Sequence, residues 1–118
     1  MTTATNGRAM RAKGSAYERD VAGYLRDSGH PFAERCYGAG RPQDVGDIDG
    51  IVGWTLEVKN HRSIDLAGWI DEAEAERANG RRGFAAVIAK RRGKPTSASY
   101  VVMSLSTFAR VLAEGDES

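Results

Sequence analysis

Hydrophobic and polar residues recur along this chain with two different periods, which predict helices and strands in turn. In residues 15–28 the apolar positions fall on one face of a helix: Tyr17, Val21, Tyr24 and Leu25. Ser15, with Glu18 three residues later, predicts a capping box at the start of this helix. Residues 1–13 lie before it and carry bases without acids, so we expect them to form a flexible basic arm.

Short runs with β character predict five strands, at residues 32–37, 47–51, 54–60, 84–89 and 100–103. The clearest period of two is in 54–60, where Trp54, Leu56 and Val58 alternate with Thr55, Glu57 and Lys59. Residues 84–89 are apolar throughout, which is typical of a strand buried on both faces.

Two further helices complete the predicted order α-β-β-β-α-β-β-α. In residues 66–79 the apolar positions Leu66, Trp69, Ile70 and Ala73 share a face, and Asn79-Gly80 provides a stop. Ser106 is a candidate cap for the last helix. This order indicates an α/β fold with a mixed central sheet flanked by helices. We expect one domain over residues 14–113, followed by a frayed acidic tail at 114–118.

Composition narrows the class of protein. The chain has 118 residues and no apolar run near the length of about 18 that spans a bilayer, and its first dozen residues lack the apolar core of a signal peptide. Cys36 is the single cysteine, which excludes an internal disulfide and a multi-cysteine zinc site. We therefore expect a cytoplasmic protein without membrane contacts.

Charge is unevenly distributed although the net charge is only +1. Five acids and no base lie between Asp65 and Glu76, whereas seven bases and no acid lie between Arg77 and Lys94. Such a basic segment suits a phosphate-binding surface, and it equally suits a solvated loop and helix end.

The candidate chemistry lies in residues 46–59. Glu57 and Lys59 are two apart on a strand, so they point to the same face. If the hairpin turns on three residues, 51–53, Asp47 lies opposite Glu57 and Asp49 opposite Thr55; a two-residue turn would instead pair Asp47 with Val58. Carboxylates beside one ammonium suit a divalent cation and phosphodiester hydrolysis. On spacing alone, an exposed charged strand face with a surface pair worth under about 1 kcal/mol fits as well.

The order of several motifs resembles a known family. Lys13-Gly14 and Glu18-Arg19 are followed by Arg35-x-x-Gly-x-Gly, Gly46-Asp47-Ile48 and Glu57-Val58-Lys59. Over residues 11–103 the chain resembles the archaeal-type and phage Holliday junction resolvases, which are PD-(D/E)xK nucleases with a restriction-endonuclease-like fold.

The resemblance implies roles for individual residues. It implies catalytic roles for Glu18, Asp47, Glu57 and Lys59, of which the three acids bind the metal. It also implies DNA contacts by Arg19 and Arg35 and by the Gly-rich loop with Gly38, Gly40 and Arg41. To these DNA contacts we add, from charge and position, Arg11, Lys13, Arg62, Arg91, Arg92 and Lys94. The family often has Gln on the second helix, where Glu72 is the nearest substitute.

We therefore expect an endonuclease that uses Mg²⁺ or Mn²⁺ to cut four-way DNA junctions by paired symmetric nicks, as a homodimer and without a nucleotide cofactor. Two alternatives stay open. One is a nuclease of the same type that acts on flaps, mismatches or specific duplex sites, and the other is a DNA-binding module without catalysis.

Overall fold

The computed structural model describes residues 3–36 and 46–116, with side chains described for 14–36 and 46–115. In order along the chain these residues form α1 (Thr3–Asp27), β1 (Glu34–Arg35), β2 (Ile48–Asp49), β3 (Trp54–Lys59), α2 (Leu66–Asn79), β4 (Phe84–Ala89), the 3₁₀ turn η1 (Thr96–Ala98), β5 (Tyr100–Val102) and α3 (Leu105–Asp116). The α/β class and the order of helices and strands are as predicted from the sequence. None of the helices in this part of the chain combines the length and apolar character that a bilayer crossing requires.

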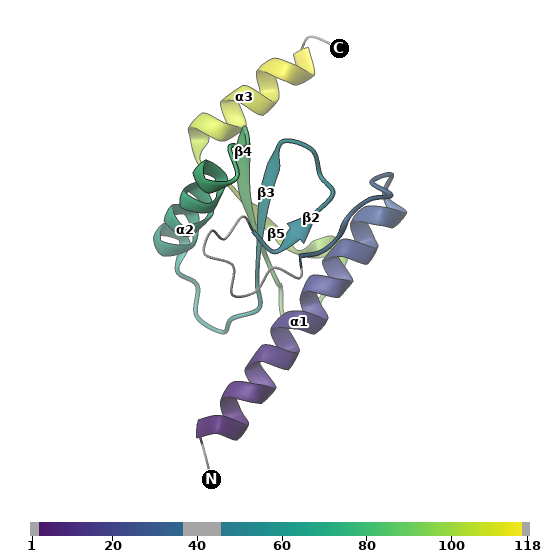
Figure 1. The fold of residues 1–118 in the computed structure, drawn as a ribbon, viewed down its shortest axis with the longest axis vertical. Helices are drawn as coiled ribbons and strands as arrows, with labels where there is room; N and C mark the ends of the chain where they lie inside the picture. The colour runs from purple at the N-terminus through teal and green to yellow at the C-terminus, as the bar shows by residue number, and fades with distance from the viewer. Residues whose placement is uncertain (1–2, 37–45, 117–118) are drawn as a thin grey trace.

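The five strands form one mixed sheet in the order β1-β2-β3-β4-β5. Only β3 and β4 run parallel among these strands, and they pair from Trp54↔Phe84 to Lys59↔Ala89. A parallel pair requires a crossover, which α2 provides. The carboxyl ends of β3 and β4 therefore lie side by side at the same end of the sheet (Figure 1).

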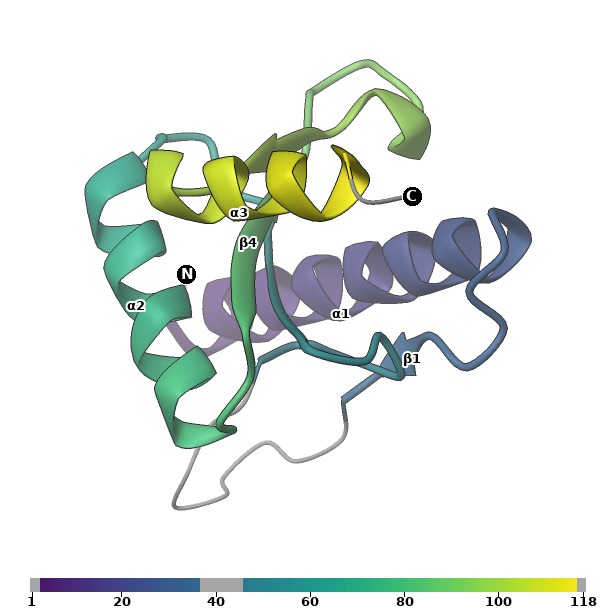
Figure 2. The same cartoon turned by 90° about the horizontal axis from the view of Figure 1, so that it is seen from above.

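Helices cover both faces of the sheet, and each face has its own core. Beneath α1, Tyr17, Val21 and Ala22 pack with Leu56, Val58, Ala86 and Ile88. Beneath α2, Trp69 and Ala73 pack with Ala85, Val87 and Ala89. Seen from above, β4 stands between α1 and α2 (Figure 2). Because side chains alternate along β3, Thr55 and Glu57 belong to the α2 side.

The hairpin between β2 and β3 has the predicted register. Ile48 pairs with Leu56, which is the register that a three-residue turn gives. Asp47 comes directly before β2, and its side chain lies beside that of Glu57. The turn is closed by the Trp54 N–H, which donates to Ile51 O at 3.2 Å, and Gly53 has a φ of +82°. The three-residue turn on 51–53 is therefore confirmed.

Several predicted boundaries are wrong. The first helix begins at Thr3, so the expected arm is helical over most of its length and Ser15 lies inside the helix instead of capping it. The strand expected at 32–37 spans only Glu34–Arg35 in the described residues, and the last helix continues to Asp116, into the expected tail. Ser104, not Ser106, caps that helix, because its Oγ accepts from the Thr107 N–H at 3.1 Å.

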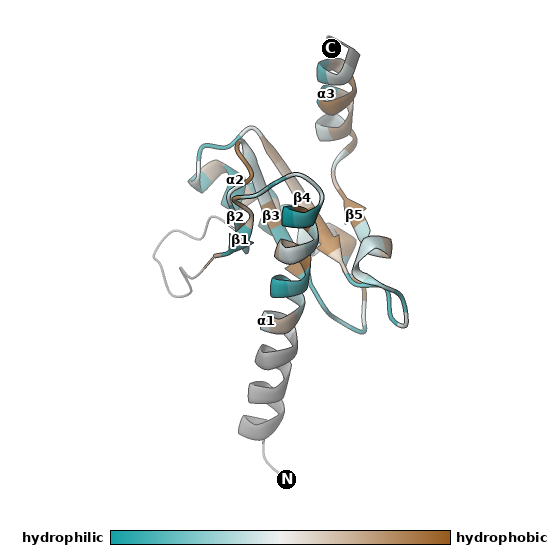
Figure 3. Cartoon of the chain, turned by 90° about the vertical axis from the view of Figure 1, so that its right-hand side faces the viewer, coloured by the Kyte–Doolittle hydropathy of each residue, from teal (hydrophilic) through white to brown (hydrophobic). Residues whose placement is uncertain are grey.

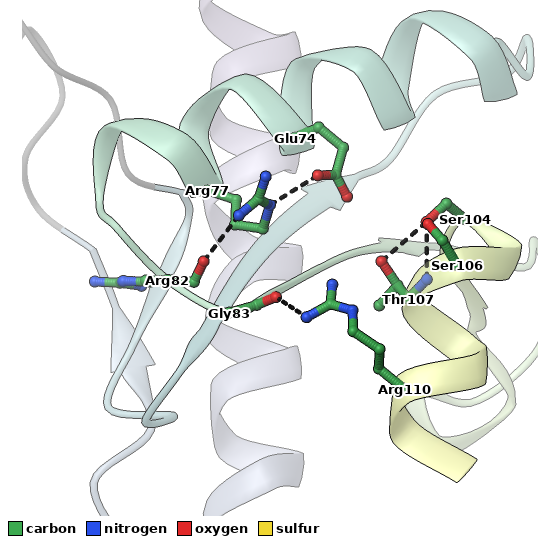
Figure 4. A network of polar contacts seen from close by, with 8 residues as sticks. All are labelled: Glu74, Arg77, Arg82, Gly83, Ser104, Ser106, Thr107 and Arg110. Carbon is green, nitrogen blue, oxygen red and sulfur yellow. Dashed lines mark hydrogen bonds and ion pairs between the residues drawn. The ribbon is translucent and has the colours of Figure 1, made fainter. Parts of the chain in front are cut away.

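Arginines fix the end of α2 and the start of β4 (Figure 4). Arg77 bonds Glu74 at 2.7 Å and donates to Arg82 O at 3.0 Å. Arg110 of α3 donates to Gly83 O at 2.7 Å. These bonds tie the turn after α2 to the helix before it and to α3, and so they help to hold α2 against the sheet.

Gly50 is the position in the hairpin where a side chain is least tolerable. Its φ is +91°, and a Cβ there would lie 1.8 Å from Phe32 O. We predict that Gly50→Ala lowers the free energy of unfolding by about 3 kcal/mol or more, because the backbone must move. Gly53→Ala is the matched control, since its φ is +82° but the space around it is open; it should cost about 1–2 kcal/mol. Urea denaturation measures both values, and equal losses would contradict this account of the hairpin.

Candidate active site

The side chains of Asp47, just before β2, and Glu57, on β3, lie side by side. Asp47 precedes β2, and its backbone N–H donates to Leu56 O at 2.8 Å. Its Oδ2 accepts a hydrogen bond from the Val58 N–H at 2.8 Å. This pair of bonds fixes the Asp47 carboxylate against β3, within hydrogen-bond reach of the Glu57 side chain.

Glu57 is an acidic side chain in the interior. It is 3% exposed, and its Oε1 accepts no hydrogen bond from the residues that the structure describes. The neighbouring strand places Val87 beside it. A carboxyl group in such a position is costly unless a proton or a cation neutralises it.

Lys59 is the cation nearest to Glu57 among the ion pairs of the described residues. Its Nζ lies 3.7 Å from Glu57 Oε2 and 2.7 Å from Glu72 Oε1. Glu72 is on α2, and its side chain is 45% exposed. The shorter contact means that Glu72 holds the Lys59 ammonium at the edge of the acidic group.

The second helix contributes two acids to this group. One oxygen each of Glu57, Glu72 and Glu76 lie within 4.8 Å of one another. Glu76 is only 5% exposed. Glu57 is the member of this group that was expected to bind metal, and the other two acids come from α2.

The close approach of these carboxyl groups and their burial shift the pKa values of Glu57 and Asp47. Burial raises the pKa of the Glu57 carboxyl to about 11, and the carboxyl groups of Glu76 and Asp47 act in the same direction. Burial also raises the pKa of Asp47; the charge of Glu18 adds to this, while the hydrogen bonds from Val58 and Glu57 and the charge of Lys59 oppose it. Without a cation, Glu57 therefore carries a proton at neutral pH.

Lys59 remains charged in spite of its partial burial. Burial alone would lower its pKa, but the hydrogen bond to Glu72 and the charges of Glu57, Glu72 and Asp47 outweigh it and raise the pKa above its usual value. The ammonium is therefore available to an anion that enters the site.

A cleft of about 710 Å³ opens over these groups. Among the residues expected at the site, those that line it are Glu18, Arg35, Asp47, Glu57, Lys59, Arg62 and Arg92. Glu18 and Arg35 form an ion pair at 2.7 Å, and Arg35 also donates to Ser15 Oγ at 2.9 Å. The first helix thus forms one wall of the cleft, and its Glu18 is paired with Arg35 of β1.

Other expected residues lie elsewhere. Arg19 and Lys94 are exposed and do not line the cleft, and Arg91 lines an adjoining pocket. Asp49 lies 3.8 Å from Arg82, which agrees with a structural role for this acid. The predictions for the side chains of Arg11 and Lys13, and for Gly38, Gly40 and Arg41, lie outside what the structure describes.

Glu76 is a buried acid of the site that was not predicted from the sequence. It lies seven residues after Trp69 and three after Ala73, on the stripe of α2 that faces the sheet. An acid at an otherwise apolar position of a helix stripe is the signal that could have identified it.

The donor set fits a hard divalent cation. The facing groups are carboxylates, the ligands that Mg²⁺ and Mn²⁺ accept. Glu57 Oε1 is in addition a buried acceptor without a hydrogen bond from the described residues. A cation here would displace the proton from Glu57, as expected where metal and proton compete for one ligand.

Comparison of the chain with protein-family models, with curated proteins and with solved structures finds no match in any of the three.

The raised pKa of Glu57 makes stability depend on pH when no metal is bound. The folded state prefers the protonated acid, so the contribution of Glu57 to stability is fully present below its unfolded pKa of 4.5 and is lost as pH rises toward 11. Between pH 5 and pH 8 the wild type should therefore lose about 1–3 kcal/mol of its free energy of unfolding, and we predict that Glu57→Gln removes this loss.

Denaturation in chelator at the two pH values measures this difference. Glu34→Gln is the matched control, since Glu34 is an exposed carboxylate on β1, and it should follow the wild type. A Glu57→Gln protein with the same pH dependence as the wild type would contradict the burial of an ionisable group at this position.

Proposed function

We propose that this chain is a metal-dependent DNA endonuclease of the PD-(D/E)xK type that cuts four-way junctions. The observation that carries the proposal is that Asp47, Glu57 and Lys59 share one cleft with the arginines Arg35 and Arg92. Carboxylates, an ammonium and guanidinium groups together suit a phosphodiester and the cation that assists its hydrolysis.

Asp47 and Glu57 are the residues that would hold Mg²⁺ or Mn²⁺. Glu72 and Glu76, on α2, lie close enough to Glu57 to serve as further ligands. Glu18 lies at the wall of the cleft. The bound cation would supply charge neutralisation of the phosphate and a water of lowered pKa.

Lys59 acts on the reacting phosphate and not as a ligand. Its ammonium is held 2.7 Å from Glu72 and 3.7 Å from Glu57, so it stays beside the ligand group without entering it. From there it stabilises negative charge that develops on the phosphate oxygens. Glu72 is a positioning residue in this account, because it acts through Lys59.

The arginines of the cleft would bind the DNA backbone. Arg35 is anchored by Glu18 and Ser15, which fixes the direction of its guanidinium group. Arg62 and Arg92, from the loops after β3 and β4, line the same cleft. Guanidinium groups in fixed positions suit phosphate oxygens through paired hydrogen bonds.

A four-way junction has two-fold symmetry, so paired nicks call for a symmetric dimer. The surface offers a candidate interface at β5 and α3, where Val101, Leu105, Phe108 and Leu112 are between 45% and 80% exposed. Figure 3 shows apolar residues on β5 and along α3. β5 is also an edge strand of the sheet, and an edge strand can pair with a strand of another chain.

We predict that the purified protein with Mg²⁺ nicks a labelled four-way junction in two opposed strands, and that Asp47→Asn abolishes nicking while junction binding persists. The substitution removes a charged ligand and keeps the side-chain shape. Gel analysis of nicked products, with a binding assay in Ca²⁺, measures both. Asp49→Asn is the matched control, because Asp49 faces Arg82 at 3.8 Å, and it should keep activity.

Full nicking by Asp47→Asn would overturn the assignment of the site. Linear duplex cut as fast as the junction would leave a nuclease of flaps, mismatches or specific sites, and binding without any metal-dependent cleavage would leave a DNA-binding module.

We predict that Lys59→Ala lowers the single-turnover cleavage rate about 10²–10³-fold and changes Mn²⁺ affinity less than threefold. The reason is that the ammonium stabilises charge in the transition state and does not bind the metal. Rapid-quench kinetics and calorimetric titration with Mn²⁺ measure the two quantities. Equal losses of rate and of affinity would show that Lys59 only maintains the ligand group.

A further inference from the structure

A second, smaller pocket adjoins the cleft at the carboxyl ends of the parallel strands. It has a volume of about 270 Å³ and lies where the chain leaves β3 and β4. The Lys90 N–H donates to Lys59 O at 3.0 Å, which keeps the two strand ends together. In α/β sheets the crevice outside the carboxyl ends of parallel strands is the usual place for a ligand.

The pocket is cationic. Five of the described residues that line it are basic, and none of these lining residues is Asp or Glu. They are Lys59, Arg62, Lys90, Arg91 and Arg92. A concave surface with this charge attracts an anion, and guanidinium groups favour phosphate over a simple halide.

The remaining walls are aromatic and apolar. Trp69, His61, Ile64 and Tyr100 line the same pocket. The His61 and Trp69 rings lie 5.7 Å apart, and the Arg91 guanidinium lies 5.2 Å from the centre of the Tyr100 ring. Ile64 is 61% exposed and Tyr100 48% exposed. Apolar surface beside cations suits a ligand with a flat ring as well as a phosphate.

The pocket and the cleft adjoin each other and share four lining residues. Lys59, His61, Arg62 and Arg92 line both. A strand whose phosphate lies over Asp47 and Glu57 would therefore continue past Lys59 into the pocket. The volume of about 270 Å³ is small beside typical ligand pockets of about 300–1,000 Å³, so it suits one nucleotide and not a base pair.

We propose that this pocket binds a single unstacked nucleotide of the strand that is cut, with its phosphate at Arg62 and Arg92 and its base against Ile64 and Tyr100. The role of the pocket in DNA cleavage rests on the proposed function. Its affinity for a nucleotide does not, because no metal and no reaction are needed for binding.

The two tryptophans of the chain allow a direct test. Trp69 lines the pocket, whereas Trp54 stacks on Phe84 at 4.8 Å, at the other end of β3. In Trp54→Phe the emission comes from Trp69 alone, and the ring stack is kept. This protein is titrated with thymidine 5′-monophosphate, with inorganic phosphate and with thymidine, in chelator.

We expect a saturable change of emission with thymidine monophosphate, and binding at least about tenfold weaker for phosphate and for thymidine. Arg62→Ala and Arg92→Ala should each weaken nucleotide binding about tenfold, through loss of a charged hydrogen bond. Arg81→Asn is the matched control: it removes one positive charge from the turn before β4, at a φ of +53° that Asn tolerates. Its effect should stay within twofold.

Three results would overturn the proposal: no saturable change with thymidine monophosphate, equal binding of phosphate and nucleotide, or equal weakening by Arg81→Asn and Arg62→Ala. The outcome is separable from that of the nuclease proposal. Nucleotide binding as expected, in a protein that cuts no DNA, would remove the nuclease and keep the pocket. Cleavage of DNA by a protein that binds no nucleotide would remove the pocket proposal and keep the nuclease.

Discussion

The burial of the Glu57 carboxyl group beside two other acids is the constraint on which the site depends. The side chain is 3% exposed on the face of β3 that α2 covers, and the side chains of Glu76 and Asp47 lie next to it. An apolar residue would be more stable there, as Val87 is on the next strand. Without a cation the group keeps a proton, so the fold carries a cost that binding of a divalent cation would relieve. Stability given up at one place in this way is typical of functional sites.

The parallel pairing of β3 with β4 explains why the charges gather where they do. It makes both strands end at one edge, so Arg62 from one loop and Arg92 from the other reach the same cleft. The crossover helix α2 then lies over the acidic face of β3 and brings Glu72 to within 2.7 Å of Lys59. The acids and Lys59 therefore lie on the α2 face of β3, and Arg62 and Arg92 lie at the carboxyl ends of the strands. A phosphate backbone at this edge would meet cations on its flanks and the carboxylates at its centre.

The sequence was sufficient where local rules decide the geometry. A three-residue turn ending at Gly53 sets the register of the hairpin, and that register is enough to bring Asp47 beside Glu57. It was insufficient where two local signals compete: the helix-forming residues before Ser15 extend α1, although Ser15 and Glu18 have the spacing of a cap. Glu76 escaped prediction because its proximity to Glu57 is set by how α2 packs on the sheet, which no short-range pattern encodes.

Anomalous diffraction from crystals soaked in Mn²⁺ tests the central claim most directly, because it locates the cation without reference to activity. The account predicts one strong peak about 2 Å from carboxylate oxygens of Glu57 and Asp47, with Lys59 outside the coordination sphere. A peak between Glu57, Glu72 and Glu76 with Asp47 uninvolved would move the cation to the α2 side of the group. Absence of any peak at Glu57 in soaked crystals would contradict the claim that this buried acid is a metal ligand.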